Sequence, residues 1–159
     1  MIVQTGTMVF DPPPMVRHHE KGRTALIELP PGLDDVYRWL LQKEYGLTLI
    51  KPVRPAHITV VPWYDSGEIE PELWEEVKAR WSGFTHDVTY RLPEGMLGMG
   101  YWWLPVVESC REPLHQIRVE LGLPPRPLSG THLTIGSVRK EDQARSDYIE
   151  SLRKNKCPY

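Results

Sequence analysis

The sequence predicts a single α+β domain made of two similar lobes. Segments of strand-like composition alternate with segments of helical periodicity, the pattern of a mixed fold. One unit also occurs twice: a helix ends at EYGL (residues 44–47) or ELGL (residues 120–123), a proline-containing linker follows, and a strand begins with histidine. The histidine lies eleven residues after the glycine in the first copy and ten in the second. This duplication predicts lobes related by an approximate twofold axis, with a cleft on that axis.

The first part of the chain is expected to start with an arm and then enter the domain. Residues 1–22 include a proline run and carry no evident periodicity, so we expect an irregular arm before a domain over residues 23–159. The apolar residues 24–29, followed by two prolines, predict a strand. The next segment begins with acidic residues, has apolar residues at helical spacing and is followed by a glycine. This pattern predicts a helix that ends before Gly46.

The rest of the chain is expected to continue the alternation. Pro71 suits the first turn of a helix, because its missing N–H has no intrahelical partner there. The PEG sequence at residues 93–95 is typical of a hairpin turn. The expected elements are a strand from residue 57 to about 63, a helix over 71–81, strands over 85–92 and 96–107, a helix over 109–121, a strand from 132 and a polar helix over 140–154.

The two histidine-bearing strands share one pattern of residue types. Residues 57–60 read HITV and residues 132–135 read HLTI. Because side chains alternate faces in a strand, each segment places a histidine and a threonine on one face and two aliphatic residues on the other. Two such strands side by side would offer an acid, a base and two hydroxyl donors.

These residue types suit the cleavage of a phosphodiester. Histidine titrates near neutral pH, so one of His57 and His132 can act as base while the other is protonated. Thr59 and Thr134 can donate hydrogen bonds to the phosphate oxygens that gain charge in the transition state. No carboxylate or cysteine lies at ligand spacing beside either histidine, so we expect no metal and no cofactor.

Composition limits the partners and the compartment. The formal net charge of −2 argues against duplex DNA as a partner, which usually requires a basic surface, and leaves a small or single-stranded nucleotide substrate. Cys110 and Cys157 lie far apart and outside any metal-ligand spacing. The apolar stretches are too short for a membrane span and no secretory signal is evident, so we expect a cytoplasmic protein without a membrane partner.

The paired motifs resemble those of the two-histidine (2H) phosphoesterase superfamily. Residues 23–31 are also similar to the first strand of its LigT-like members. The resemblance implies antiparallel sheets with outer helices around a V-shaped groove, and catalytic roles for His57, Thr59, His132 and Thr134. The short chain further resembles compact phage members, among them anti-CBASS nucleases that degrade cyclic oligonucleotide signals.

Five further residues are candidates for substrate contact. Trp63 and Tyr64 follow the first motif strand, and Trp103 shares a strand face with Tyr101; such rings can stack on bases, although aromatic residues more often pack in cores. Arg54 and Arg139 flank the motif strands and can attract phosphate, although surface charges commonly serve solubility alone.

The leading interpretation is a metal-independent phosphodiesterase that acts on 2′,3′-cyclic phosphates or on 3′–5′ linkages in small or cyclic oligonucleotides, as in phage counter-defence. An enzyme of RNA processing that acts on RNA ends, with 2′,3′-cyclic phosphodiesterase or 2′–5′ RNA ligase-like activity, is the first alternative. A module that binds a nucleotide or RNA without cutting it is the second.

Overall fold

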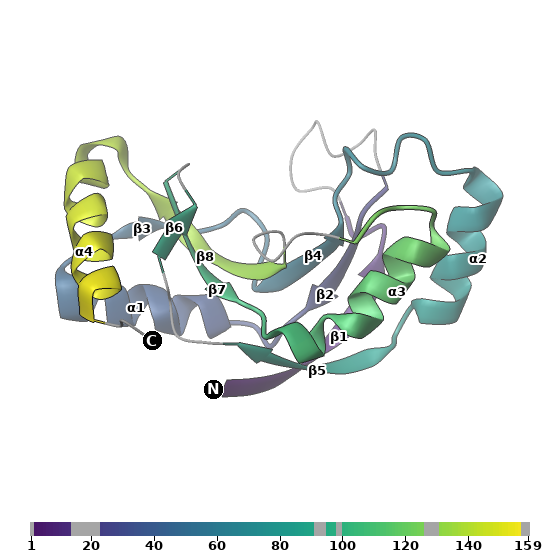
Figure 1. Cartoon of the computed structure of the whole chain (residues 1–159), viewed down its shortest axis with the longest axis horizontal. Helices are drawn as coiled ribbons and strands as arrows, with labels where there is room; N and C mark the ends of the chain where they lie inside the picture. Colours follow the sequence, from purple (N-terminus) through teal and green to yellow (C-terminus); the bar gives the residue numbers. More distant parts are fainter. Residues whose placement is uncertain (1, 14–22, 91–94, 98–99, 126–130, 157–159) are drawn as a thin grey trace.

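The computed structural model describes residues 2–13, 23–90, 95–97, 100–125 and 131–156. These residues form an α+β fold, with helices α1 and α4 towards one end, α2 and α3 towards the other, and one sheet between them (Figure 1). The sheet order is β5-β1-β2-β4-β8-β7-β6, with β3 paired to β8. The elements are β1 (Ile2–Phe10), β2 (Ala25–Glu28), α1 (Leu33–Tyr45), β3 (Leu49–Ile50), β4 (His57–Val61), α2 (Pro71–Trp81), β5 (Thr85–Tyr90), β6 (Gly95–Leu97), β7 (Tyr101–Pro105), α3 (Glu112–Glu120), β8 (His132–Val138) and α4 (Gln143–Lys156).

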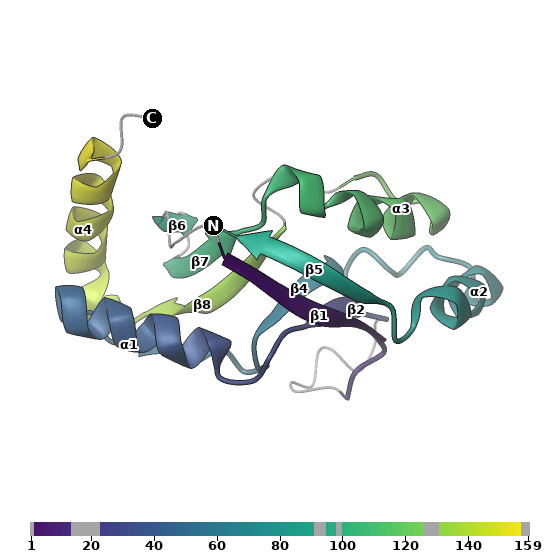
Figure 2. The same cartoon turned by 90° about the horizontal axis from the view of Figure 1, so that it is seen from below.

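The first strand corrects the expectation of an irregular arm over residues 1–22. Strand β1 pairs antiparallel with β2 along one edge and with β5 along the other, so it belongs to the interior of the sheet (Figure 2). Met8 and Phe10 are buried in the core. Residues 14–22 of the expected arm lie outside the described residues.

The strand pattern of β1 is weak in the sequence for a physical reason. Its inward positions include Gln4 and Gly6, which contribute little to an apolar alternation. Gly6 is nevertheless required by packing, because a Cβ there would lie 2.2 Å from Cγ2 of the buried Ile27 on β2. A side chain at this position would push β1 away from its neighbour.

The expected hairpin at residues 93–95 is wrong. Strand β5 pairs with β1, while β6 pairs with β7, so β5 and β6 lie at opposite ends of the sheet order. The expected strand over residues 96–107 is divided into β6 and β7, and Gly100 between them has a φ of 79°. Strand β5 pairs along its length with β1, a strand that the sequence did not predict. Residues 93 and 94 themselves lie outside the described residues.

The helices confirm the duplicated pattern, with small differences at their ends. Gly46 follows α1 with a φ of 62° and Gly122 follows α3 with a φ of 73°, left-handed conformations that suit glycine. The helices expected to begin near residues 109 and 140 are preceded by short 3-10 turns, Glu108–Cys110 and Lys140–Asp142. Helices α3 and α4 therefore begin a few residues later than expected.

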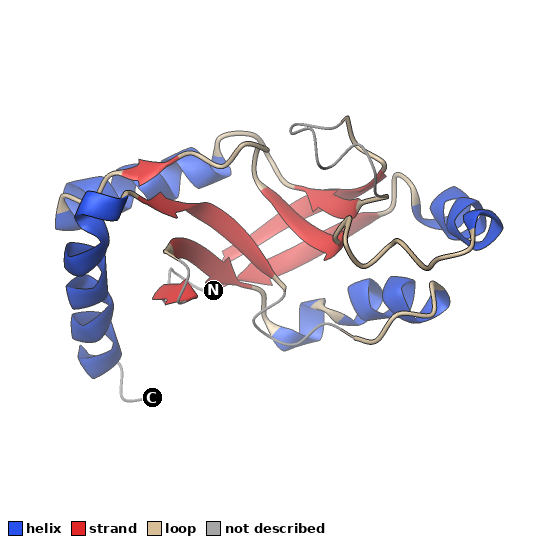
Figure 3. Cartoon of the chain, turned by 90° about the horizontal axis from the view of Figure 1, so that it is seen from above, coloured by secondary structure: helices blue, strands red, loops and turns tan. Residues whose placement is uncertain are grey.

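The core lies between the sheet and the helices, and its central layer comes from the motif strands. Ile58 on β4 and Leu133 on β8 are buried and belong to one cluster with Leu41 of α1 and Ile117 of α3. Figure 3 shows the strands in the middle of the molecule and the helices towards its two ends. Helix α1 packs against β8, and α3 packs against β4, so each helix supports the motif strand of the other copy. No helix in the described part of the chain is long and apolar enough to cross a membrane.

Candidate active site

The two motif strands are neighbours in the sheet, and their register brings the four motif side chains together. Ile58 pairs antiparallel with Leu133. Continued by one residue to either side, this register places His57 across from Thr134 and Thr59 across from His132, and residues across from each other share a face. All four are half-buried, whereas the aliphatic residues between them are buried on the other face. The register therefore directs both histidines and both threonines to one face, where His57 and Thr134 line the same pocket.

A bulge follows the threonine of the first motif. On the β2 side of β4, Leu26 is the partner of Thr59 and Ala25 is the partner of Val61. Val60 is thus an extra residue in β4 with no partner in β2. Such a bulge turns the strand locally and interrupts the ladder of backbone hydrogen bonds.

The second motif has a bulge at the equivalent position. On the β7 side of β8, Trp103 is the partner of Thr134 and Trp102 is the partner of Gly136. Ile135 is the extra residue. The two motif strands thus match in residue types, in their pairing with each other and in the position at which each is bulged.

His57 is held in one neutral form. Its Nδ1 lies 2.7 Å from the carbonyl oxygen of Pro55, which can only accept, so the neutral ring carries its proton on Nδ1 and its lone pair on Nε2. Burial lowers the pKa of His57 below the ordinary value of 6.5, and the nearby charge of Arg54 lowers it further. The hydrogen bond to Pro55 and the carboxylates of Asp34 and Glu28 act in the opposite direction. The result favours a neutral imidazole that can accept a proton.

His132 has a different neighbour, the ring of Trp103. The two ring centroids lie 5.3 Å apart in a tilted arrangement, so the indole covers part of the imidazole. Among the described residues, the buried Nε1 of Trp103 has no hydrogen-bond partner.

A pocket of about 220 Å³ is lined by one histidine and one threonine of the two motifs. His57 and Thr134 line it together with Arg54 and Tyr101, so the expected position of Arg54 near the first motif is observed. Nη2 of Arg54 also donates to the carbonyl oxygen of Pro13, at 2.8 Å, which brings the segment after β1 close to the pocket. The remaining lining residues are Pro52, Val53, Gly136 and Ser137.

Glu28 is a site residue that sequence reasoning missed. It is the direct cross-strand partner of His57, at the end of β2, and its carboxylate raises the pKa of that histidine. The signal in the sequence was a single acidic residue in an otherwise apolar strand, but its relevance depends on which strand lies beside the first motif. Pro105 occupies the corresponding place opposite His132.

The remaining aromatic and basic candidates lie elsewhere. Tyr64 is exposed and its ring packs edge-on against Trp63, with centroids 5.7 Å apart. Arg139 is exposed after β8 and does not line the pocket of His57. Trp102, which the alternation of β7 directs away from Trp103, is fully buried and donates to Oγ of Ser146, at 2.9 Å.

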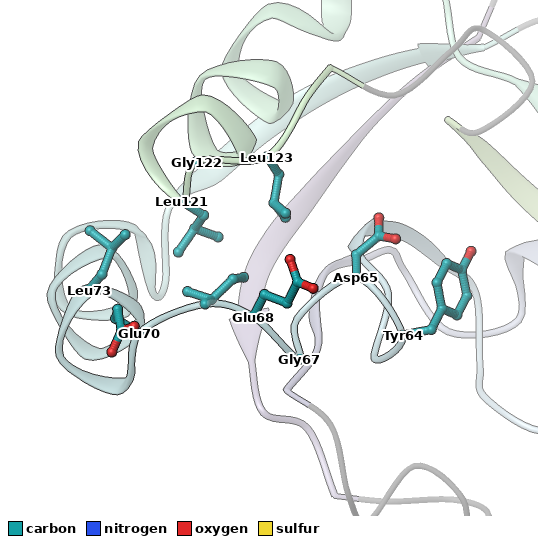
Figure 4. Close-up of a pocket in the computed structure, with 10 residues that line it drawn as sticks. Tyr64, Asp65, Gly67, Glu68, Glu70, Leu73, Leu121, Gly122 and Leu123 are labelled. Atoms are coloured by element: carbon teal, nitrogen blue, oxygen red, sulfur yellow. The ribbon is translucent and has the colours of Figure 1, made fainter.

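Tyr64 belongs to a second pocket, of about 430 Å³, between the connection after β4 and the end of α3. Leu121 and Leu123 form one wall, and Glu68 and Leu73 lie across from them (Figure 4). The pocket is separate from the one that contains His57 and Thr134.

Metal ligands and relatives give no further assignment. Over the described ranges, no group of three or more His, Cys, Asp or Glu side chains is arranged to hold a metal ion. Comparison of the chain with protein-family models, curated proteins and solved structures finds no match. The geometry of the two motifs is therefore the feature of this chain that bears on its function.

Proposed function

We propose that this chain is a metal-independent phosphodiesterase of the two-histidine type that cleaves RNA-type linkages in small nucleotides. The observation that carries the proposal is the β4–β8 register, which directs both motif histidines and both motif threonines to one half-buried face. This arrangement supplies a base, an acid and two hydroxyl donors around one phosphate.

We also propose that the two halves of the chain are pseudo-twofold-related lobes with a groove between them. Three matched features support this: the paired motifs, the bulge after each threonine, and the crossed packing of α1 on β8 and α3 on β4. A phosphate on the axis would face one histidine and one threonine from each lobe.

In the first step, Nε2 of His57 accepts the proton of the 2′-hydroxyl, and the 2′-oxygen attacks phosphorus. The bond between phosphorus and the 5′-oxygen breaks, and protonated His132 gives its proton to that leaving oxygen. Thr59 and Thr134 donate hydrogen bonds to the non-bridging oxygens as these gain charge. The product is a 2′,3′-cyclic phosphate.

Hydrolysis of the cyclic phosphate reverses the two histidine roles. His132, now neutral, accepts a proton from water while the water oxygen attacks phosphorus. Protonated His57 then returns its proton to the leaving ribose oxygen, which restores the starting state. The same site can therefore open a 2′,3′-cyclic phosphate that arrives as substrate.

The substrate class we propose is a cyclic or short oligonucleotide. The pocket beside His57 is small, and the net charge of −2 provides no general attraction for a long polyanion. Processing of 2′,3′-cyclic RNA ends uses the same chemistry and is the second candidate, because His57 and Thr134 line one pocket that could hold a single terminal nucleotide.

The test is turnover of a panel in the presence of EDTA: cyclic dinucleotides, cyclic trinucleotides and RNA with a 2′,3′-cyclic end. We expect hydrolysis that His57→Ala and His132→Ala each reduce by at least about 10³-fold. His86→Ala is the matched control, since His86 lies on β5 and contacts the carbonyl oxygen of Cys110.

Each outcome decides between functions. Cleavage confined to RNA ends assigns the second candidate. Recovery of intact, bound ligand after long incubation identifies a binding module and rejects catalysis. Full activity in either histidine variant, or loss of activity with EDTA that added metal restores, overturns the mechanism.

A further inference from the structure

The motif strands pair with each other at only one described position, Ile58 with Leu133. Two residues further along each strand lies its bulge, at Val60 and Ile135. Both residues are buried, so their carbonyl oxygens need a donor other than water or the neighbouring strand.

An arginine of α3 supplies the donor on β4. Nη1 of Arg118 donates to the carbonyl oxygen of Val60, at 3.0 Å, and the arginine is 4% exposed. The same nitrogen donates to the carboxylate of Asp65, at 3.1 Å, and Nε donates to the carbonyl oxygen of Pro124, at 2.7 Å. The guanidinium is thus fixed from three sides.

An arginine of α1 does the same on β8. Nη1 of Arg38 donates to the carbonyl oxygen of Ile135 and to the carboxylate of the buried Asp34, and Nη2 contacts Asp35. Arg38 precedes the first motif in the chain but holds the second motif strand, and Arg118 precedes the second motif but holds the first. Each arginine thus crosses to the other copy of the duplicated unit.

We propose that Arg38 and Arg118 are paired positioning residues, each of which holds the bulge of the opposite motif strand and thereby fixes the adjacent motif threonine. A planar guanidinium with several donors can bind a carbonyl and a carboxylate at once, which an apolar residue cannot do. Arg118 acts on Thr59, the residue before Val60, and Arg38 acts on Thr134, the residue before Ile135.

This inference rests on the proposed phosphodiesterase function for its catalytic part only. A shift of about an ångström in a group that stabilises the transition state is costly in kcat, whereas substrate binding depends on many other contacts. We therefore expect Arg118→Met and Arg38→Met each to lower kcat by roughly 10–100-fold with KM within about 3-fold.

The crossed pairing makes a sharper test through double-mutant cycles. In a Thr59→Val background, Arg118→Met should lower kcat by no more than about 3-fold, but in a Thr134→Val background it should keep its full effect. Arg38→Met should show the reverse pattern. Arg118→Lys and Arg38→Lys, which retain a donor, should recover part of the lost activity.

Arg145→Met is the matched control. Arg145 also donates to a backbone carbonyl oxygen, that of Tyr45, at 2.7 Å, but it touches neither motif strand. We expect unchanged kcat for this variant at a temperature well below its unfolding transition.

Amide hydrogen exchange tests the structural part even if no substrate is turned over. Arg118→Met should increase exchange in β4 around Val60 and leave β8 unchanged, and Arg38→Met should do the opposite around Ile135. Three results would overturn the inference. In the first, the kcat effects of each arginine variant add to those of both threonine variants. In the second, Arg145→Met lowers kcat as much as the two arginine variants do, and in the third, amide protection falls equally in β4 and β8. If the wild-type protein turns over no substrate but the two variants show the strand-specific exchange, the proposed function is rejected. The two arginines then remain residues that stabilise the bulges of β4 and β8.

Discussion

Gly6→Ala tests the close approach of β1 to its antiparallel neighbour β2 at residue 6. The added Cβ would lie 2.2 Å from Cγ2 of Ile27 and 3.0 Å from the carbonyl oxygen of Glu28. An ordinary contact begins at about 3.4 Å, so one strand must move by about 1 Å. Ile27 is fully buried and has no room to yield, because interiors are close-packed.

The expected cost follows from this overlap. Overpacking of a buried site costs about 1–3 kcal/mol, and the lower entropy of the unfolded alanine chain returns about 0.4–1 kcal/mol. A net loss of about 1 kcal/mol lowers the Tm of a chain of this size by about 2–4 °C. Thermal unfolding followed by circular dichroism measures the change.

Gly67→Ala provides the control for Gly6→Ala. Nothing lies within 4 Å of a Cβ at residue 67, and its φ is not in the left-handed region, so we expect stability equal to or slightly above that of the wild type. If Gly6→Ala is as stable as Gly67→Ala, β1 does not pack against β2 as described, and the reasoning from close approach is refuted.

Three further perturbations separate the site from the core. Glu28→Gln removes a carboxylate that raises the pKa of His57, so the pKa falls further and the acidic limb of the kcat/KM profile moves to lower pH; an unmoved limb would dismiss His57 as the base. Trp103→Leu uncovers His132 and removes a possible stacking surface, so KM should rise by roughly 5–100-fold, measured by steady-state kinetics. Trp102→Phe leaves the buried serine of α4 without its donor and should cost about 1–3 kcal/mol in chemical unfolding with little change in kcat.

The placement of each motif's histidine and threonine on one strand face could be predicted from the sequence because it is local. The spacing of His57 and Thr59 fixes a shared face in any strand, and the repeat of that pattern at His132 and Thr134 indicated a common site. The glycines after α1 and α3 were also readable, since a left-handed residue after a helix favours glycine wherever the helix packs.

The remaining features depend on contacts between distant parts of the chain. Strand β1 was not predicted because its inward-facing residue 6 is a glycine, which adds nothing to an apolar alternation. The close approach of β2 requires glycine there. Arg38 and Arg118 look like ordinary helix-surface charges in the sequence, and only the folded chain brings them to the carbonyl oxygens of the bulged residues Ile135 and Val60. Tyr64 is close to the first motif in sequence but is carried to another pocket by the connection after β4.

The duplicated framework also explains how two similar motifs can take different chemical roles. Equivalent register positions hold different residues: Glu28 lies opposite His57, and Pro105 lies opposite His132. His57 is also buried, close to Arg54 and fixed in one tautomer by a backbone carbonyl. In the proposed mechanism, the matched backbone pairing of the two motifs presents both imidazoles to one phosphate, while the asymmetric neighbours favour the neutral form of His57 and therefore its role as the base in transesterification.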